Sequence, residues 1–201
     1  MPKITLFTTT QTILYEGNHP DITSAIEFCV QNNIPLNAID LSFQKIYPIN
    51  LDGVCIQGAS FRETDLTGAN MSEAKFTDCD FSGATLIDVC LCYTDLKRCN
   101  FKYTTFGHTD ISMASLDSCA FEGWSTLSLD FHTAFKLAEL TYTHHQEICP
   151  FYSPPTLIHH QGQQIAVFDT KAIYREKPHT LERENTPESI YTPPKHDTIY
   201  S

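Results

Sequence analysis

The chain has 201 residues and a formal net charge of −11 at pH 7, so it suits one domain of ordinary size. This acidic balance argues against binding to nucleic acid phosphates, which depends on clustered Lys and Arg. No apolar run is long enough to span a bilayer, and residues 1–10 lack a basic region followed by an apolar core, so we expect no membrane span, no Sec-type signal and a cytoplasmic location.

Residues 1–35 are predicted to form a small α/β unit. Lys3–Phe7 and residues 11–15 are two short β-branched and aromatic runs around a Thr-rich turn, which indicates a β-hairpin. Asp21 can then cap a helix with one apolar face that runs to about Asn32. We expect this unit to cover the open end of the repeat that follows.

A bulky apolar residue returns at every fifth position through residues 36–131, with an exception at Thr126. The series is Leu36, Leu41, Ile46, Leu51, Ile56, Phe61, Leu66, Met71, Phe76, Phe81, Leu86, Leu91, Leu96, Phe101, Phe106, Ile111, Leu116, Phe121 and Phe131. From Val54 to Cys119, a small residue lies two positions before each member. A period of five matches neither a helix nor a flat strand. The pattern instead predicts that each five-residue unit forms one side of a narrow prism, so that four such units make one coil.

These residues resemble the pentapeptide-repeat family, whose pattern is roughly Ala-(Asp/Asn)-Leu-x-x. The closest copies are Ala59-Ser60-Phe61-Arg62-Glu63, Thr64-Asp65-Leu66-Thr67-Gly68, Ala69-Asn70-Met71-Ser72-Glu73 and Ala84-Thr85-Leu86. The resemblance implies an all-β solenoid over residues 36–131, a right-handed quadrilateral β-helix with four pentapeptides in each coil.

Residues twenty apart should then stack from coil to coil. The expected aromatic column is Phe61, Phe81, Phe101 and Phe121, and the small column beside it is Ala59, Cys79, Cys99 and Cys119. The cysteines of this column would serve as compact apolar fillers; disulfides between adjacent coils are the alternative. The remaining cysteines have no zinc-like spacing, and a reducing compartment fits this usage. All eleven prolines lie at or before Pro48 or at or after Pro150, as a continuous ladder requires.

The repeat fails at Trp124, which is too large for a small-residue position, and at Thr126, so we expect the coils to end there. Residues 132–142 can form a short helix with Phe135, Ala138 and Tyr142 on one side. In several members of the family, a helix after the last coil makes a two-fold dimer. The resemblance therefore implies a homodimer through residues 132–142, and the alternative is a simple cap.

The C-terminal part is expected to contain a loop, a hairpin and a tail. Residues 149–155 are predicted to be a loop, and Thr156–His160 and residues 164–173 form the hairpin, with its turn at Gln161 and Gly162. Residues 132–175 thus make a helix and hairpin extension. Residues 176–201 are rich in Glu, Lys, Pro, Thr and His and are predicted to be disordered.

No motif of enzyme chemistry is present in the sequence. It has no Gly-rich phosphate loop, no Gly-x-Ser-x-Gly elbow and no recognisable catalytic triad, and a close-packed prism leaves no cavity for a small substrate. The one cluster with ligand chemistry is His144, His145, Cys149, His159 and His160, whose spacing fits no zinc pattern. We expect a protein that is not an enzyme and has no metal or cofactor.

Function should therefore lie on outward surfaces. The side built on Leu51, Met71, Leu91 and Ile111 is the candidate, because it has no basic residue. It carries Asp52, Glu73, Tyr93, Asp110 and Met113, together with Cys90 and Cys92. Negative charge around exposed Tyr and Met suits a protein partner with a basic, partly apolar groove. The alternative is that this side is merely solvated.

The resemblance suggests one class of partner. Some pentapeptide-repeat proteins resemble B-form DNA in width and charge and occupy the DNA-binding saddle of bacterial DNA gyrase. Here, residues 51–131 carry twelve acidic and five basic residues, and the excess is not arranged in long ladders. An acidic DNA mimic that acts on gyrase or on another DNA-handling protein is the first functional hypothesis.

The tail suggests a different class. Tyr191 and Tyr200 lie in two similar acidic-small-Ile-Tyr-small segments. These segments are similar to the phosphorylation motifs of bacterial effectors injected into animal cells, and phosphate there would create an Arg-binding determinant. The second hypothesis is therefore an effector secreted into a host cell by a specialised secretion system. The third is a generic protein-binding scaffold.

Overall fold

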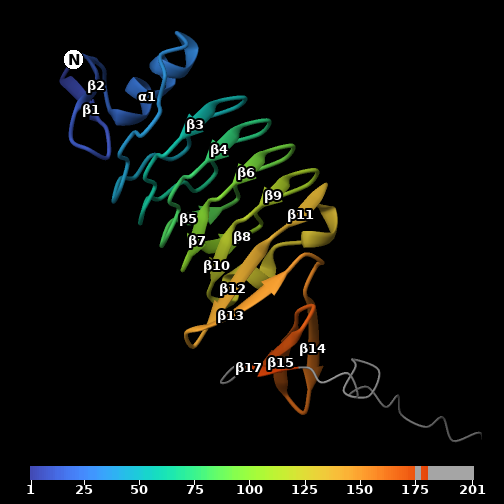
Figure 1. Cartoon of the computed structure of the whole chain (residues 1–201). Coiled ribbons are helices and arrows are strands. Elements are labelled where there is room, and N and C mark those ends of the chain that lie inside the picture. Colours follow the sequence, from blue (N-terminus) through green and yellow to red (C-terminus); the bar gives the residue numbers. More distant parts are fainter. Residues whose placement is uncertain (175–177, 181–201) are drawn as a thin grey trace, which may run out of the picture.

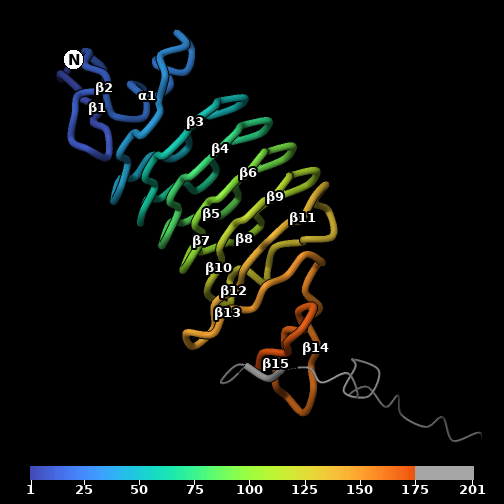
Figure 2. The backbone as a smooth tube through the Cα atoms, in the orientation of Figure 1, coloured from blue at the N-terminus to red at the C-terminus, as the bar shows by residue number. Residues whose placement is uncertain are grey.

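The central part of the chain is a four-sided β-solenoid of about four turns, seen in a computed structural model that describes residues 1–174 and 178–180. Figure 1 shows the coils stacked in sequence order from the blue N-terminal unit to the orange strands, and the tube in Figure 2 traces the same succession of loops. The all-β solenoid predicted from the five-residue period is confirmed. No helix in the described part of the chain is long and apolar enough to cross a membrane.

The N-terminal unit is a hairpin followed by one helix. Strands β1 (Lys3–Phe7) and β2 (Ile13–Asn18) pair antiparallel, and α1 (Ile22–Gln31) follows. The Asp21 carboxylate caps α1 by accepting a hydrogen bond of 2.8 Å from the backbone N–H of Ser24. One face of α1 is fully buried, and a backbone hydrogen bond of 2.9 Å from Asp40 to Phe7 joins the hairpin to the first coil.

Each side of the solenoid is a parallel ladder, in which residue i lies beside residue i + 20 until the last coil, where the partner is residue i + 21. One side holds β3 (Cys55–Gln57), β4 (Lys75–Thr77), β6 (Asp95–Lys97), β9 (Ser115–Asp117) and β11 (Lys136–Ala138). The next holds β7 (Asn100–Lys102), β10 (Ala120–Glu122) and β12 (Leu140–His144). A third holds β5 (Thr85–Ile87) and β8 (Thr105–Gly107). The fourth is joined by single bridges between successive coils, which pair Asn50 with Asn70, Asn70 with Cys90, and Cys90 with Asp110.

The aromatic column forms the core of one side. The rings of Phe61, Phe81, Phe101 and Phe121 stack nearly parallel, with centroid distances of 4.6, 5.0 and 5.4 Å between successive members. The small column beside it is buried, and its cysteines are free thiols. Adjacent coils are therefore held together both by backbone hydrogen bonds and by the stacked, buried side chains of the core.

The corners of the coils have a repeated backbone conformation. Every fifth residue from Gly53 to Gly123 has a positive φ, and most of these residues are not glycine. A left-handed conformation costs an ordinary residue about 1 kcal/mol. Hydrogen bonds between coils offset this cost: the backbone N–H of Glu73, for example, donates to the carbonyl of Cys92 at 2.9 Å.

The prediction of a helix over residues 132–142 is wrong. The chain instead forms two short 3-10 helices, Trp124–Ser128 and Phe131–Thr133, and then continues as β11 and β12. Leu137 pairs with Leu116, 21 residues earlier, so one residue is inserted and the five-residue pattern loses its phase. The segment completes the last coil, and its buried residues are part of the core. The helix on which a two-fold dimer through residues 132–142 would depend is therefore absent from this segment.

A hairpin and a small sheet follow the last coil. Strand β13 (Glu147–Phe151) pairs antiparallel with β12, so Cys149 is buried in a strand and the loop expected over residues 149–155 begins only after Phe151. Residues 147–151 form a strand because their backbone is hydrogen-bonded to that of β12. The remaining strands are β14 (Thr156–His160), β15 (Gln163–Val167), β16 (Lys171–Tyr174) and β17 (Pro178–Thr180).

The predicted hairpin turn is present between β14 and β15. Gln161 and Gly162 both have positive φ, 48° and 78°, the combination that a two-residue type I′ turn requires. The second strand expected over residues 164–173 is divided, because Phe168 leaves the sheet to pack on Tyr142 and Phe151 at ring distances of 5.0 and 5.3 Å. The predicted disorder of residues 176–201 concerns a region largely outside the described residues.

Candidate interaction surfaces

The structure brings the five predicted binding residues to one side of the solenoid. We call this side, built on Leu51, Met71, Leu91 and Ile111, the acidic face. The bridges from Asn50 to Asp110 run along it, and the four inward residues are buried. The outward candidates are Asp52, Glu73, Tyr93, Asp110 and Met113, all of which are exposed.

Three of these candidates form one column at a corner of the coils. Glu73, Tyr93 and Met113 occupy equivalent positions in successive coils, and each has a φ between 56° and 59°. Their backbone N–H groups donate to the next coil at 2.8 to 2.9 Å, so the column has a rigid base. The side chains of Tyr93 and Met113 are 64% and 45% exposed. With coils about 4.8 Å apart, a carboxylate, a phenol and a thioether follow one another at regular intervals.

The carboxylates of the acidic face are not neutralised by basic side chains of the described residues. Asp52, Glu73 and Asp110 form no ion pair with any residue that the structure describes. Elsewhere on the solenoid, acidic residues are often paired, as in the 2.6 Å contact between Arg98 and Asp78. Hydrogen bonds from Ser112 hold the pKa of Asp110 below its usual value. This face therefore presents negative charge to solvent at neutral pH.

Two thiols lie beside these carboxylates. The Sγ atoms of Cys90 and Cys92 are 3.0 Å apart, and Ser72 Oγ lies 3.1 Å from Cys90 Sγ. Both cysteines are half-buried. Burial raises the pKa of Cys90, but its hydrogen bonds with Ser72 and Cys92 outweigh this effect, so the pKa of Cys90 is lowered in total. Burial, with hydrogen bonds to Cys90 and Asp110, raises the pKa of Cys92 to about 12.

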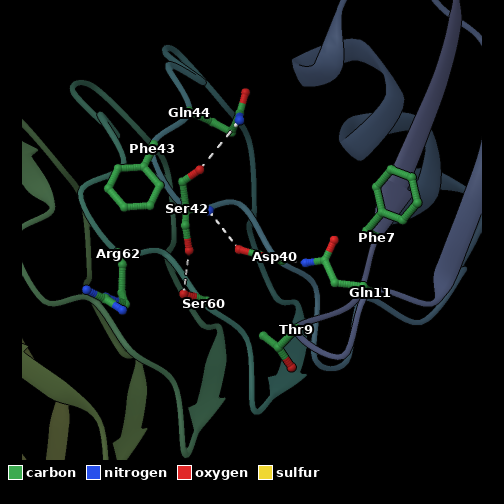
Figure 3. A pocket seen from close by; sticks show the side chains of 9 residues that line it. All are labelled: Phe7, Thr9, Gln11, Asp40, Ser42, Phe43, Gln44, Ser60 and Arg62. Atoms are coloured by element: carbon green, nitrogen blue, oxygen red, sulfur yellow. Dashed lines mark hydrogen bonds between the residues drawn. The ribbon is translucent and has the colours of Figure 1, made fainter.

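A groove between the N-terminal hairpin and the first coils was not predicted from the sequence. Its volume is about 420 Å³, and Figure 3 shows the nine side chains that line it. Phe7 and Phe43 are 40% and 65% exposed, and Asp40 and Arg62 add one charge of each sign. The available signal was Phe43, an aromatic residue between the buried positions 41 and 46 and therefore out of phase with the core.

The histidine-rich segment is not assembled into a ligand cluster. His144 is buried in β12 with its ring centroid 4.1 Å from that of His145, and Cys149 is buried in β13. His159 and His160 lie exposed on β14. Within the described residues, no group of three His, Cys, Asp or Glu side chains is arranged to hold a metal ion.

The comparison of sequences finds a counterpart to the five-residue period of the coils. The model of pentapeptide repeats matches residues 49–83 and 79–117, in eight copies. The matched part of the solenoid is therefore similar to the pentapeptide-repeat family. No curated protein matches the chain.

Solved structures of the same kind are similar to part of the chain. A pentapeptide repeat protein from the thylakoid lumen of Arabidopsis thaliana is 32% identical over 40% of this chain and 63% of its own length, with a TM-score of 0.34. Rfr23 from the cyanobacterium Cyanothece 51142 is 13% identical over 54% of this chain and 84% of its own, with a TM-score of 0.44. QnrB1, a plasmid-mediated fluoroquinolone resistance protein, is 20% identical over 52% of each chain, with a TM-score of 0.43.

Proposed function

We propose that this chain is a non-catalytic protein-binding module whose acidic face docks into a basic, partly apolar groove of a partner. The observation that carries the proposal is the combination of Asp52, Glu73 and Asp110, which have no counter-ion among the described residues, with the exposed side chains of Tyr93 and Met113. Unpaired carboxylates steer a cationic surface and select against anionic ones. An exposed Tyr at the centre of such a face is a typical energetic anchor.

The rigidity of the coils favours this role. The backbone of the acidic face is hydrogen-bonded from coil to coil; Tyr93, for example, donates to Ser112 in the next coil at 2.9 Å. A platform that is ordered before binding loses little conformational entropy when a partner docks. The face is therefore suited to binding without rearrangement of its backbone.

The class of partner that we propose is a DNA-handling protein, with bacterial DNA gyrase as the specific candidate. A protein that binds DNA has a groove lined with Lys and Arg, which is the surface that an acidic rod complements. Twelve acidic against five basic residues over positions 51–131 support this reading. The effector hypothesis depends on Tyr191 and Tyr200, which lie outside the described residues, and it remains the alternative.

The proposal is tested by the supercoiling activity of purified gyrase, titrated with the full-length chain. Three variants separate the hypotheses. The first is the acidic-face variant, which combines Asp52→Asn, Glu73→Gln and Asp110→Asn. The second removes the same charge elsewhere on the solenoid, with Glu63→Gln, Asp65→Asn and Glu139→Gln. The third is the tail variant, which combines Tyr191→Phe and Tyr200→Phe.

We expect the wild-type, charge-control and tail proteins to inhibit supercoiling equally and the acidic-face variant to inhibit it at least tenfold more weakly. Equal inhibition by all four proteins would show that the acidic face has no role. No inhibition by the wild-type chain at a large molar excess would exclude gyrase as the target and direct attention to the phosphorylation of the two tail tyrosines.

A further inference from the structure

We propose that Cys90 and Cys92 form a redox-active pair, a site at which a small disulfide oxidant closes a reversible bond between the two sulfur atoms. The pair belongs to the chain itself, so this inference does not depend on the identity of a binding partner. Its basis is the 3.0 Å distance between the two Sγ atoms on a partly exposed part of the surface.

The backbone holds the two thiols side by side. Leu91, between them, points inward and is 1% exposed, so its two neighbours both point outward, as residues i and i + 2 of an extended segment do. Hydrogen bonds to adjacent coils fix this segment: Cys90 donates to Ala69 at 3.1 Å, and Leu91 donates to Asp110 at 2.8 Å. Two extended residues span roughly 6.6 Å, which lies within the Cα separations of about 4.4 to 6.8 Å that disulfides bridge. The sulfur atoms need to approach by only about 1 Å to reach bonding distance.

The other cysteines have a different environment. Cys79, Cys99 and Cys119 form the buried small column and donate to backbone carbonyls of the preceding coil. Cys29 and Cys149 are also buried. Cys55 is exposed, and no thiol contact is found for it among the described residues. An oxidant in solution therefore meets two adjacent thiols only at positions 90 and 92.

The two thiols differ in a way that suits stepwise exchange. The lowered pKa of Cys90 makes it the attacking thiolate, and the raised pKa of Cys92 keeps that thiol protonated until the second step. In the first step, the Cys90 thiolate attacks one sulfur of oxidised glutathione, the bond between the two glutathione sulfurs breaks, and one glutathione thiolate leaves with the electron pair.

In the second step, Cys92 gives its proton to solvent and attacks Cys90 Sγ, which displaces the second glutathione thiolate. The two protein thiols thus lose two electrons and two protons, and one molecule of oxidised glutathione becomes two molecules of reduced glutathione. Because the bond closes a small ring at the surface, a thiol reductant will reopen it readily. The site is therefore a switchable modification on the acidic face.

The test uses the full-length chain, reduced and then equilibrated in buffers with increasing ratios of oxidised to reduced glutathione. Free thiols are alkylated under native conditions, and intact mass and peptide mass spectra are recorded. We expect the protein to become lighter by two hydrogen atoms, with positions 90 and 92 protected from alkylation together, and dithiothreitol to reverse the change.

Two variants serve as controls. Ser72 and Ser112 occupy the positions of Cys92 in the neighbouring coils, so Cys92→Ser is compatible with the fold and is expected to stop after the first step, with one glutathione bound at Cys90. Cys55→Ser should behave as the wild-type protein does. Full alkylation of Cys90 and Cys92 at the most oxidising ratio, or a disulfide that involves any other cysteine, would overturn the proposal.

Discussion

Phe121 pairs with Tyr142 across the parallel strands β10 and β12, and it pairs with Phe101 across β10 and β7. The first separation is 142 − 121 = 21 residues and the second is 121 − 101 = 20 residues. The aromatic column thus continues into the last coil although one residue has been inserted. The 3-10 helix Trp124–Ser128 lies within the coil that contains this insertion, so the register of the core is kept while the corner changes.

The ring of Tyr142, and not its hydroxyl group, should carry the stabilising role. The side chain is fully buried, and its hydroxyl has no hydrogen-bond partner among the described residues. We expect Tyr142→Phe to raise the free energy of unfolding by about 1 kcal/mol, since a buried polar group without a partner is destabilising. Tyr142→Ala should lower it by about 3 to 5 kcal/mol. Urea denaturation measures both; a Phe variant that is clearly less stable than the wild-type protein would show that the hydroxyl makes a favourable interaction.

Gly68 should stabilise the fold through its backbone conformation alone. Its φ is 70°, and a Cβ atom at this position would meet nothing within 4 Å. Gly68→Ala is therefore expected to cost about 1 kcal/mol through the left-handed backbone, without any clash. Gly107→Ala is the matched control, because Gly107 lies in β8 without a positive φ and a Cβ there would meet Ile87 at an ordinary 3.5 Å. Equal losses for the two variants in chemical denaturation would contradict this explanation.

His144 should make the C-terminal end of the solenoid sensitive to acid. Burial lowers its pKa, and the charge of His145 lowers it further, while a hydrogen bond with the backbone of Tyr174 and the charge of Glu122 oppose the shift. A histidine with a pKa below its unfolded value of about 6.5 binds fewer protons when folded, so stability falls as the pH drops below about 6.5. We expect the melting temperature of the wild-type protein to fall between pH 7.5 and pH 5.5 by more than that of His144→Gln. The same pH dependence in both proteins would assign the effect to other groups.

The five-residue period was enough to predict the solenoid and its inward columns, because a repeat of known geometry fixes which side chains stack. It also assigned Asp52, Glu73, Tyr93, Asp110 and Met113 to one side, where the structure places them. Their role in binding stays a prediction. The prediction from the five-residue period failed after Trp124. The inserted residue shifts the phase of the period, and the apolar residues of the last coil then have the spacing of an amphipathic helix.

The groove lined by Phe7 and Phe43 could not be predicted from the sequence pattern, for a different reason. These side chains come from β1 and from the first coil, and their approach depends on how the hairpin docks against that coil. The contact between Cys90 and Cys92 was equally hidden, because a period identifies the side on which thiols lie but not the distance between their sulfur atoms. The five-residue period therefore predicts the solenoid, whereas the groove and the thiol contact depend on tertiary packing.

Binding of the acidic face to a basic groove is measured by the affinity of purified gyrase for the immobilised full-length chain at two salt concentrations. We expect the acidic-face variant to lose at least about tenfold in affinity, equivalent to about 1.4 kcal/mol, and to show a weaker salt dependence than the wild-type protein. The variant with Glu63→Gln, Asp65→Asn and Glu139→Gln should bind within about twofold of the wild-type protein, because a charge far from an interface has little effect on affinity. Equal affinities of gyrase for the acidic-face variant and the wild-type protein at both salt concentrations would show that this face does not bind the groove.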